Sequence, residues 1–232
     1  MSPRTLLPPA SAALFDCDGV VLDTEGLYSQ FWSGIGTRFF PESPSFAKDI
    51  KGLTLTEIIS RWFIGRPDDE AAARQALANF ERGMAYEYIA GARELLETLR
   101  AQGVKTALVT SSDRAKMQRV DAARPELRSL FDCIVTAEDV RLCKPSPEAF
   151  LVAAERLGVD IAHCIVFEDS RNGLLAARRS GAYVVGLTTT NPIEVVAPLS
   201  DVQVADLREV ASGCPSPPPV TSDELGYAEG ET

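Results

Sequence analysis

The sequence predicts an α/β protein whose core is a doubly wound parallel sheet, with an α-helical domain inserted after the first strand. Two observations predict this fold. From residue 91 onward, short apolar runs alternate with amphipathic segments of helical length, and this order requires right-handed crossovers between parallel strands. Before that point, residues 24–90 are helical in character and interrupt the alternation between the first strand and the second.

The first strand is predicted at residues 11–16, which read SAALFD. The insertion follows it directly. Apolar residues recur at helical spacing over residues 25–40, and Thr54 and Glu57 have the spacing of a capping box at the start of another helix. A long helix is predicted over residues 68–89. The inserted domain thus begins at the C-terminal end of the first strand, which is where open α/β sheets bind ligands.

The remaining elements alternate regularly. The first helical segment stops at Gly103, while Ser146 is placed to cap a helix that Pro147 begins and Gly158 follows. The predicted strands of this part are residues 104–110, 164–169 and 183–187, and the helical segments are residues 92–103, 146–158 and 172–181.

The predicted domain boundaries follow from this alternation. Residues 1–23 and 91–213 form the α/β core, and residues 24–90 form the helical insertion. Residues 214–232 are rich in proline and acidic residues and contain no basic residue, a composition that favours a disordered tail.

The charge and the cysteine pattern restrict the partners of the protein. A formal net charge of -10 disfavours nucleic acid or an anionic membrane as a partner, because phosphate groups would be repelled over most of the surface. No apolar run approaches the roughly 20 residues that span a bilayer. The five cysteines form no CxxC pair, which indicates reduced thiols. We expect a cytoplasmic protein that binds a small phosphorylated metabolite. Its oligomeric state is left open, with a monomer favoured.

Polar side chains collect where the predicted strands end. Because the C-terminal ends of parallel strands share one edge of a sheet, residues that are distant in sequence converge there. The set comprises Asp16 and Asp18 after the first strand, Thr110, Ser111 and Ser112 after the second, Lys144 before a helix, and Glu168 and Asp169 after the third. One crevice is predicted to hold these carboxylates together with the ammonium group.

Such a crevice favours a divalent cation and a phosphate group. Ionised carboxylates repel one another in a poorly solvated cleft unless a cation is present, and a cluster of oxygen ligands suits Mg²⁺. The hydroxyls and backbone amides of Thr110, Ser111 and Ser112 can bind phosphate oxygens, and Lys144 adds a second positive charge. The residues therefore predict a cation-assisted phosphate site.

Four motifs in this order resemble those of the haloacid dehalogenase (HAD) superfamily: FDCDGVVLDTE, LVTSS, KPSPEAF and VFEDSRNG. The resemblance covers residues 11–190. It is specific to the branch with a helical cap after the first strand, to which β-phosphoglucomutase-like phosphatases belong. It implies a HAD-like Rossmannoid core, a cap domain formed by the insertion, and a Mg²⁺-dependent phosphatase that works through an aspartyl phosphate.

The resemblance also implies roles for the acidic residues. Asp16 resembles the nucleophile that attacks phosphorus, and Asp18 resembles the residue that acts first as general acid and then as general base. The implied Mg²⁺ ligands are Asp16, Asp18 through its backbone carbonyl, Glu168 and Asp169.

The phosphate group has its own implied partners. Thr110 resembles the hydroxyl that orients the phosphate, assisted by Ser111 and Ser112. Lys144 resembles the lysine that neutralises both the nucleophile and the transferring group. Phosphoryl transfer requires mainly in-line positioning and charge neutralisation, and these residues are suited to both.

The cap separates two possible activities. KGLTLTE resembles the substrate loop of the sugar-phosphate mutases, with Lys51 and Gly52 in place, but the mutases carry an Arg where this chain has Leu55. They also carry a His where this chain has Tyr28. We expect Lys51, Gly52 and Tyr28 to contact the substrate. The two departures remove a grip on a distal phosphate and a polar partner in the cap, which argues against a mutase.

We therefore expect a phosphatase that hydrolyses a small phosphomonoester, such as a sugar phosphate. The alternative is a mutase of the β-phosphoglucomutase type. A third hypothesis is a non-catalytic binding module that retains the fold. The joint presence of Asp16, Asp18, Lys144 and Asp169 argues against it, because a decayed site would lack at least one of them.

Overall fold

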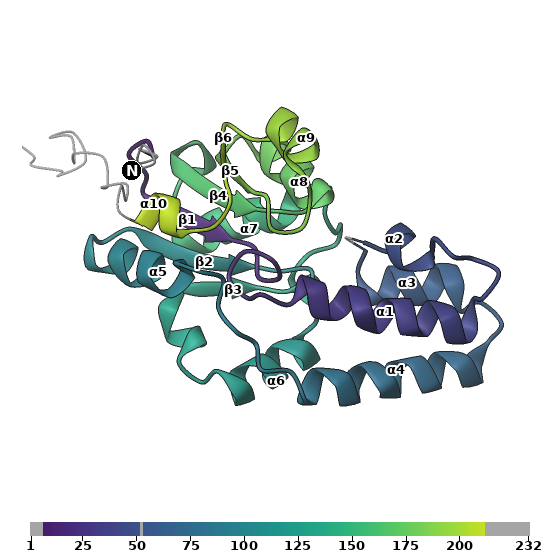
Figure 1. The fold of residues 1–232 in the computed structure, drawn as a ribbon. Coiled ribbons are helices and arrows are strands. Elements are labelled where there is room, and N and C mark those ends of the chain that lie inside the picture. The colour runs from purple at the N-terminus through teal and green to yellow at the C-terminus, as the bar shows by residue number, and fades with distance from the viewer. Residues whose placement is uncertain (1–6, 52, 212–232) are drawn as a thin grey trace, which may run out of the picture.

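The sheet has the predicted parallel, doubly wound topology. The computed structural model describes residues 7–51 and 53–211. Within them, parallel strands form one sheet in the order β3-β2-β1-β4-β5-β6, as Figure 1 shows. Their bounds are β1 (Ala12–Phe15), β2 (Lys105–Val109), β3 (Cys133–Val135), β4 (Cys164–Glu168), β5 (Tyr183–Leu187) and β6 (Val202–Val204). The edge strands β3 and β6 are missing from the prediction because three residues form too short an apolar run to recognise.

Helices cover both faces of the sheet. One face packs against α5 (Ala92–Ala101), α6 (Arg114–Ala123) and α10 (Arg208–Ala211), and the other against α7 (Glu148–Leu157) and α8 (Arg171–Ser180). Ala13 and Phe15 belong to the first apolar core, and Ala12 and Leu14 to the second. Because alternate residues of a strand face opposite sides, β1 is apolar throughout. The connecting helices are α9 (Ile193–Val196) and the 3₁₀ turns Leu127–Leu130, Ala137–Asp139, Ile161–His163 and Ala197–Leu199.

The inserted domain is helical, as predicted, and has an apolar core of its own. It consists of α1 (Glu25–Phe39), α2 (Phe46–Asp49), α3 (Leu55–Trp62) and α4 (Pro67–Arg82). Figure 1 shows these helices grouped together at the right, beside the sheet. Phe40 stacks on Phe46 with ring centroids 4.7 Å apart and meets Phe63 edge-on at 5.0 Å. Gly36 allows α1 to approach this cluster, since a Cβ there would lie 2.9 Å from the ring of Phe46. We call this domain the cap.

The helix ends agree with the predicted signals in most places. Thr54 and Glu57 form the predicted capping box at the start of α3. Gly158 ends α7 in the left-handed conformation, with a φ of 65°. The same helix begins one residue later than predicted. Pro147 occupies its N-cap, and the hydroxyl of Ser146 accepts a hydrogen bond from the backbone N–H of Glu148 at 3.3 Å.

Helix α4 is shorter than the predicted helix over residues 68–89. It ends at Arg82, after which the chain returns to the core. Tyr86 takes a positive φ of 50°, and Tyr88 forms an antiparallel bridge to Leu22. The apolar residues that suggested a longer helix belong instead to this return segment, which packs on the core.

The tail at residues 214–232 lies outside the described residues, and the domain boundaries after residues 23 and 90 stay predictions. Among the described helices, none is long and apolar enough to cross a membrane.

Candidate active site

The strand ends meet at one edge of the sheet because the strands are parallel and in register. Phe15, the last residue of β1, pairs with Leu108 of β2 and with Phe167 of β4. The backbone N–H of Asp16 then donates to the carbonyl of Phe167 at 3.0 Å. As a result, Asp16 lies beside Glu168, the last residue of β4.

Lys144 joins the two carboxylates of this edge. Its Nζ lies 2.5 Å from Oδ1 of Asp16 and 2.7 Å from Oε1 of Glu168, and it donates to the carbonyl of Val109 at 3.0 Å. Burial alone would lower the pKa of Lys144, but Asp16 and Glu168 raise it above its usual value. The lysine is therefore a permanent cation within hydrogen-bonding distance of the expected nucleophile.

The carboxylate of Glu168 is held by the main chain. It is fully buried, and its Oε2 accepts hydrogen bonds from the backbone N–H groups of Asp169 and Ser170, both at 2.9 Å. Helix α8 begins directly beyond it. A Cβ at Gly173 would lie 1.7 Å from Oε1 of Glu168, so the glycine of the motif VFEDSRNG lets the helix pack against this carboxylate.

Three buried carboxylates form a group suited to a metal ion. Asp16, Glu168 and Asp169 each offer an oxygen, and these oxygens lie within 4.8 Å of one another. Oδ1 of Asp169 is buried and has no hydrogen-bond partner among the described residues, while its Oδ2 accepts from the hydroxyl of Thr190. A set of hard oxygen ligands with one unpartnered oxygen fits Mg²⁺.

The electrostatics of this group also favour a cation. Burial raises the pKa of Asp16 to about 7, and the repulsion from Glu168 adds to the effect, while Lys144 opposes it. Burial likewise raises the pKa of Asp169 well above its usual value, with repulsion from Glu168 and Asp16 as further causes. One lysine therefore does not balance the three carboxylates, and a divalent cation would offset the remaining repulsion.

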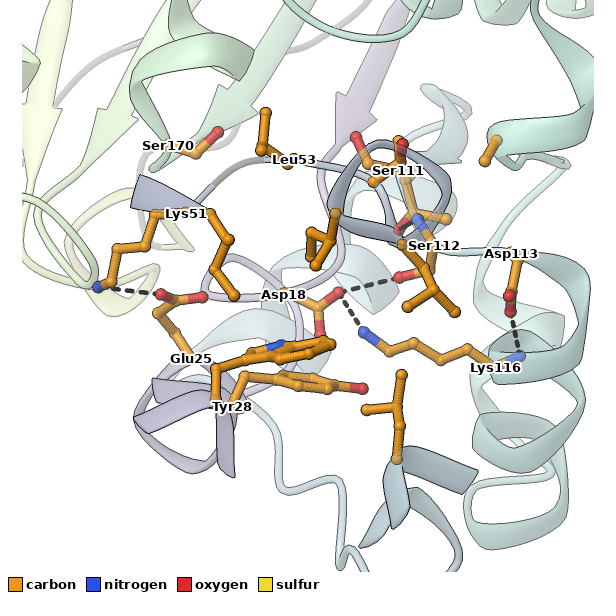
Figure 2. Close-up of a pocket in the computed structure, with 18 of the residues that line it drawn as sticks. Asp18, Glu25, Tyr28, Lys51, Leu53, Ser111, Ser112, Asp113, Lys116 and Ser170 are labelled. Atoms are coloured by element: carbon orange, nitrogen blue, oxygen red, sulfur yellow. Dashed lines mark hydrogen bonds and ion pairs between the residues drawn. The ribbon is translucent and has the colours of Figure 1, made fainter. Parts of the chain in front are cut away.

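Asp18 makes a separate set of contacts. Figure 2 shows its carboxylate turned toward Ser112 and Lys116. Oδ2 accepts from Nζ of Lys116 at 2.5 Å and from the hydroxyl of Ser112 at 3.1 Å, and Oδ1 accepts from the hydroxyl of Thr24 at 2.5 Å. Burial would raise the pKa of Asp18, but Lys116 and the two hydroxyls lower it. The side chain lies outside the carboxylate group, so a metal contact from Asp18 would fall to its backbone carbonyl.

The hydroxyl residues after β2 line the same site. Thr110 is buried, and its hydroxyl accepts a hydrogen bond from the backbone N–H of Ser112 at 3.0 Å, which shapes the turn into α6. Asp113 caps that helix by accepting from the backbone N–H of Lys116 at 2.7 Å. Ser111 and Ser112 face the cavity beside Asp18 (Figure 2).

A cavity of about 1150 Å³ lies between the core and the cap. Its lining includes Asp16, Asp18, Thr110, Ser111, Ser112, Lys144 and Asp169 from the core, and Tyr28 and Lys51 from the cap. Lys51 forms an ion pair with Glu25 at 3.1 Å, and the hydroxyl of Tyr28 donates to Glu81 at 3.0 Å. Gly52 lies outside the described residues. Glu168 is not part of this lining. The structure thus brings the other described candidates around one space large enough for a small metabolite.

The structure adds residues that the sequence pattern did not indicate. Lys116 and Thr24 bind Asp18, and Thr190 binds Asp169. Thr24 occupies the N-cap position of α1, yet its hydroxyl bonds Asp18 and no backbone amide of the helix. For Thr190 a signal existed, because the polar run after β5 ends at the same edge of the sheet. For Lys116 the sequence holds no such signal, since a lysine on an amphipathic helix is expected to face the solvent.

Comparisons with known proteins point to one family. Residues 10–181 match the family described as haloacid dehalogenase-like hydrolase. A validoxylamine A 7'-phosphate phosphatase from Streptomyces hygroscopicus subsp. limoneus is 35% identical over 203 residues, which span 85% of this chain and 94% of that protein. A beta-phosphoglucomutase from Mycobacterium tuberculosis is 29% identical over an alignment of 248 positions, which covers 86% of this chain and 90% of that protein.

The fold also matches solved structures. The CbbY protein from Rhodobacter sphaeroides, solved as a variant in complex with xylulose-(1,5)bisphosphate, superposes with a TM-score of 0.71 at 21% identity. The match covers 89% of this chain and 99% of that one. At this identity the likeness concerns the fold alone.

Proposed function

The chain belongs to the haloacid dehalogenase-like hydrolase family and is a hydrolase of phosphomonoesters, and from this premise we propose that it releases phosphate from a small metabolite through an aspartyl phosphate on Asp16. The substrate class is a sugar phosphate or a similar compound. The observation that carries the proposal is the buried arrangement of Asp16, Lys144 and Asp169 on one side of the cap cavity, with Asp18 held by separate contacts.

Asp16 is the nucleophile in this proposal. A carboxylate oxygen attacks phosphorus, and the bond from phosphorus to the leaving oxygen breaks. Lys144 contacts Asp16 directly, so it stabilises the ionised nucleophile before attack and the charge of the phosphoryl group during transfer. The hydroxyls of Ser111 and Ser112, after β2, and the buried Thr110 orient the phosphate oxygens.

Asp16, Glu168 and Asp169 would hold Mg²⁺, with the backbone carbonyl of Asp18 as a further ligand. When bound, the ion supplies positive charge to the phosphate oxygens and to the nucleophile. The chain itself keeps these ligands in place. Backbone N–H groups hold Glu168, and Gly19 leaves room for Asp169, because a Cβ at Gly19 would lie 2.1 Å from its Oδ2.

Asp18 moves the protons. It gives one to the leaving oxygen in the first step and takes one from water in the second, when water attacks phosphorus and releases the Asp16 carboxylate. Its carboxylate is available for both because it stands apart from the carboxylate group around Asp169 and borders the cavity.

Hydrolysis is favoured over the mutase reaction by the cap. Tyr28 stands where the mutases carry a His, and here its hydroxyl is engaged by Glu81. Leu55, which replaces the Arg of the mutases, lines the cavity with an apolar side chain. A substrate that lacks these two contacts at its distal end would leave after one transfer, and water would then complete the reaction.

Replacing Asp16 by Asn tests the mechanism. With p-nitrophenyl phosphate and Mg²⁺, the D16N protein should release no p-nitrophenol above background. Asp160→Asn is the matched control, because Asp160 precedes β4 at the opposite edge of the sheet and should leave the rate unchanged. Full activity of D16N would refute the assignment. Absence of turnover in the unmodified protein, with every phosphate ester and divalent metal tried, would favour the non-catalytic binding module.

The product of a sugar phosphate separates the two activities. With β-glucose 1-phosphate, or with a panel of phosphorylated metabolites, we expect free phosphate as the product. Conversion of β-glucose 1-phosphate mainly to glucose 6-phosphate, with little phosphate released, would establish the mutase instead.

A further inference from the structure

Lys116 is a buried lysine that the proposed mechanism leaves without a role. It lies in the first turn of α6, where Asp113 caps the helix and accepts its backbone N–H at 2.7 Å. Only 7% of the residue is exposed, and its Nζ reaches Oδ2 of Asp18 at 2.5 Å. Because burying an ammonium group is unfavourable without a partner, the ion pair with Asp18 is what keeps this side chain inside the site.

The cap encloses the same lysine from the other side. The ring of Tyr28, on α1, faces Nζ of Lys116 with its centroid 4.3 Å away, a cation–π contact. The hydroxyl of Tyr28 donates to Glu81 at the end of α4, and Glu81 pairs with Arg119 of α6 at 2.8 Å. Lys116 thus lies between a core carboxylate and a cap ring that is itself tied back to α6.

From these contacts we propose that Lys116 is a positioning residue for Asp18, and that the ring of Tyr28 holds it in place from the cap. The inference rests on the proposed function, in which Asp18 transfers protons. Without Lys116, the carboxylate would keep the hydroxyls of Thr24 and Ser112 as its side-chain partners among the described residues, and it would be free to turn away from the reacting phosphate.

The second half of the reaction depends most on this positioning. The oxygen of water attacks phosphorus, the bond between phosphorus and the Asp16 oxygen breaks, and its electron pair returns to the Asp16 carboxylate. The proton of the water goes to Asp18, which later gives it to the next leaving group. With p-nitrophenyl phosphate, the first half needs little help from Asp18, because p-nitrophenolate leaves without a proton. A displaced Asp18 should therefore slow the second half more than the first.

Rapid-mixing kinetics with p-nitrophenyl phosphate and Mg²⁺ test the inference. In K116M we expect a burst of p-nitrophenol close to one per enzyme, followed by steady turnover on the order of 100-fold slower than in the unmodified protein, since a general base contributes about 10²–10⁴-fold. Because only the second half is slowed, KM should fall together with kcat, and kcat/KM should stay within about threefold. Lys105→Met is the control. That lysine bonds the carbonyl of Leu157 at the opposite edge of the sheet, and its loss should leave the kinetics unchanged.

A double-mutant cycle separates positioning from a general loss of structure. If Lys116 acts through Asp18, then K116M should add less than about threefold to the loss in D18N, whereas independent structural damage would multiply the two losses. Lys116→Gln provides a second variant, and thermal unfolding measures whether each protein is folded. Tyr28→Leu should show a larger burst and slower steady turnover than Tyr28→Phe, because phenylalanine keeps the ring that faces Lys116.

The outcomes distinguish two failures. If D18N turns over at the normal rate, the proton-transfer role of Asp18 is wrong and the inference falls with it. If D18N is slow while folded K116M and K116Q show normal turnover and no burst, the proposed function stands and the inference about Lys116 is refuted.

Discussion

Replacing Gly173 by alanine would place a methyl group in the buried carboxylate of Glu168. The new Cβ would lie 1.7 Å from Oε1 and 2.3 Å from Oε2, far inside van der Waals contact. The backbone at this position is helical, so alanine is otherwise compatible with it and would favour the helix by up to about 1 kcal/mol. Any loss of stability therefore measures the displacement of Glu168.

The size of that loss follows from the contacts of Glu168. To escape the methyl group, the carboxylate must give up Lys144 at 2.7 Å and the two backbone N–H groups at 2.9 Å. Breaking a buried ion pair costs about 3–5 kcal/mol. After the helical gain of about 1 kcal/mol, we expect G173A to lower the free energy of unfolding by about 2–4 kcal/mol, which corresponds to a Tm lower by roughly 4–16 °C in a protein of this size.

Thermal unfolding followed by circular dichroism measures the change in Tm. The rate of p-nitrophenyl phosphate hydrolysis measures whether the active site is still functional. Gly34→Ala is the matched control, because Gly34 is also helical and a Cβ there would meet nothing within 4 Å. We expect G34A to raise Tm slightly and to leave the rate unchanged, and G173A to lower both Tm and rate. A G173A protein as stable and active as G34A would refute the packing argument.

Three further predictions concern charges. Lys144→Met leaves the buried carboxylates around it unpaired, so urea denaturation at neutral pH should show a loss of about 3–5 kcal/mol; an unchanged midpoint would contradict this. Mg²⁺ at about 100 times its Kd should stabilise the protein by about 2.7 kcal/mol, and Asp169→Asn should abolish that rise in Tm; an equal rise in the variant would place the ion elsewhere. Burial would raise the pKa of Asp139, but bonds from Thr136 and Arg156 lower it. Its contribution is therefore present above its ordinary pKa of 3.8 and lost as the pH falls further, so Asp139→Asn should be less stable at pH 7 and the difference should shrink in acid. A constant difference would refute the linkage.

Residues that follow a buried strand could be predicted from the sequence alone. Asp16, Thr110 and Glu168 each end an apolar run, and the parallel sheet places such ends together, so their convergence required no knowledge of side-chain contacts. The same reasoning predicted the cap, because a helical insertion after β1 must lie over that edge.

Residues whose position depends on the cap could not be predicted in this way. Lys116 is polar and sits on an amphipathic helix, and only the ring of Tyr28 and the carboxylate of Asp18 explain its burial. Glu81 is comparable: it ends a charged helix in the sequence, yet it is 4% exposed because Arg119 reaches it from the core. These contacts join segments that share no local pattern, so they appear only when the two domains are packed together.

The pairing of β1 has a consequence for the order in which the chain folds during synthesis. Ala12 of this central strand pairs with Lys105 and with Cys164, so β1 leaves the ribosome long before either neighbouring strand exists. The cap is complete much earlier, since the described residues of its apolar core lie between Phe31 and Ala76. We therefore expect the growing chain to contain a collapsed cap while the apolar segment AALF is not yet paired with β2 and β4. In that interval the strand that leads into Asp16 is an exposed apolar segment, which a chaperone could shield until Lys105 and Cys164 are made.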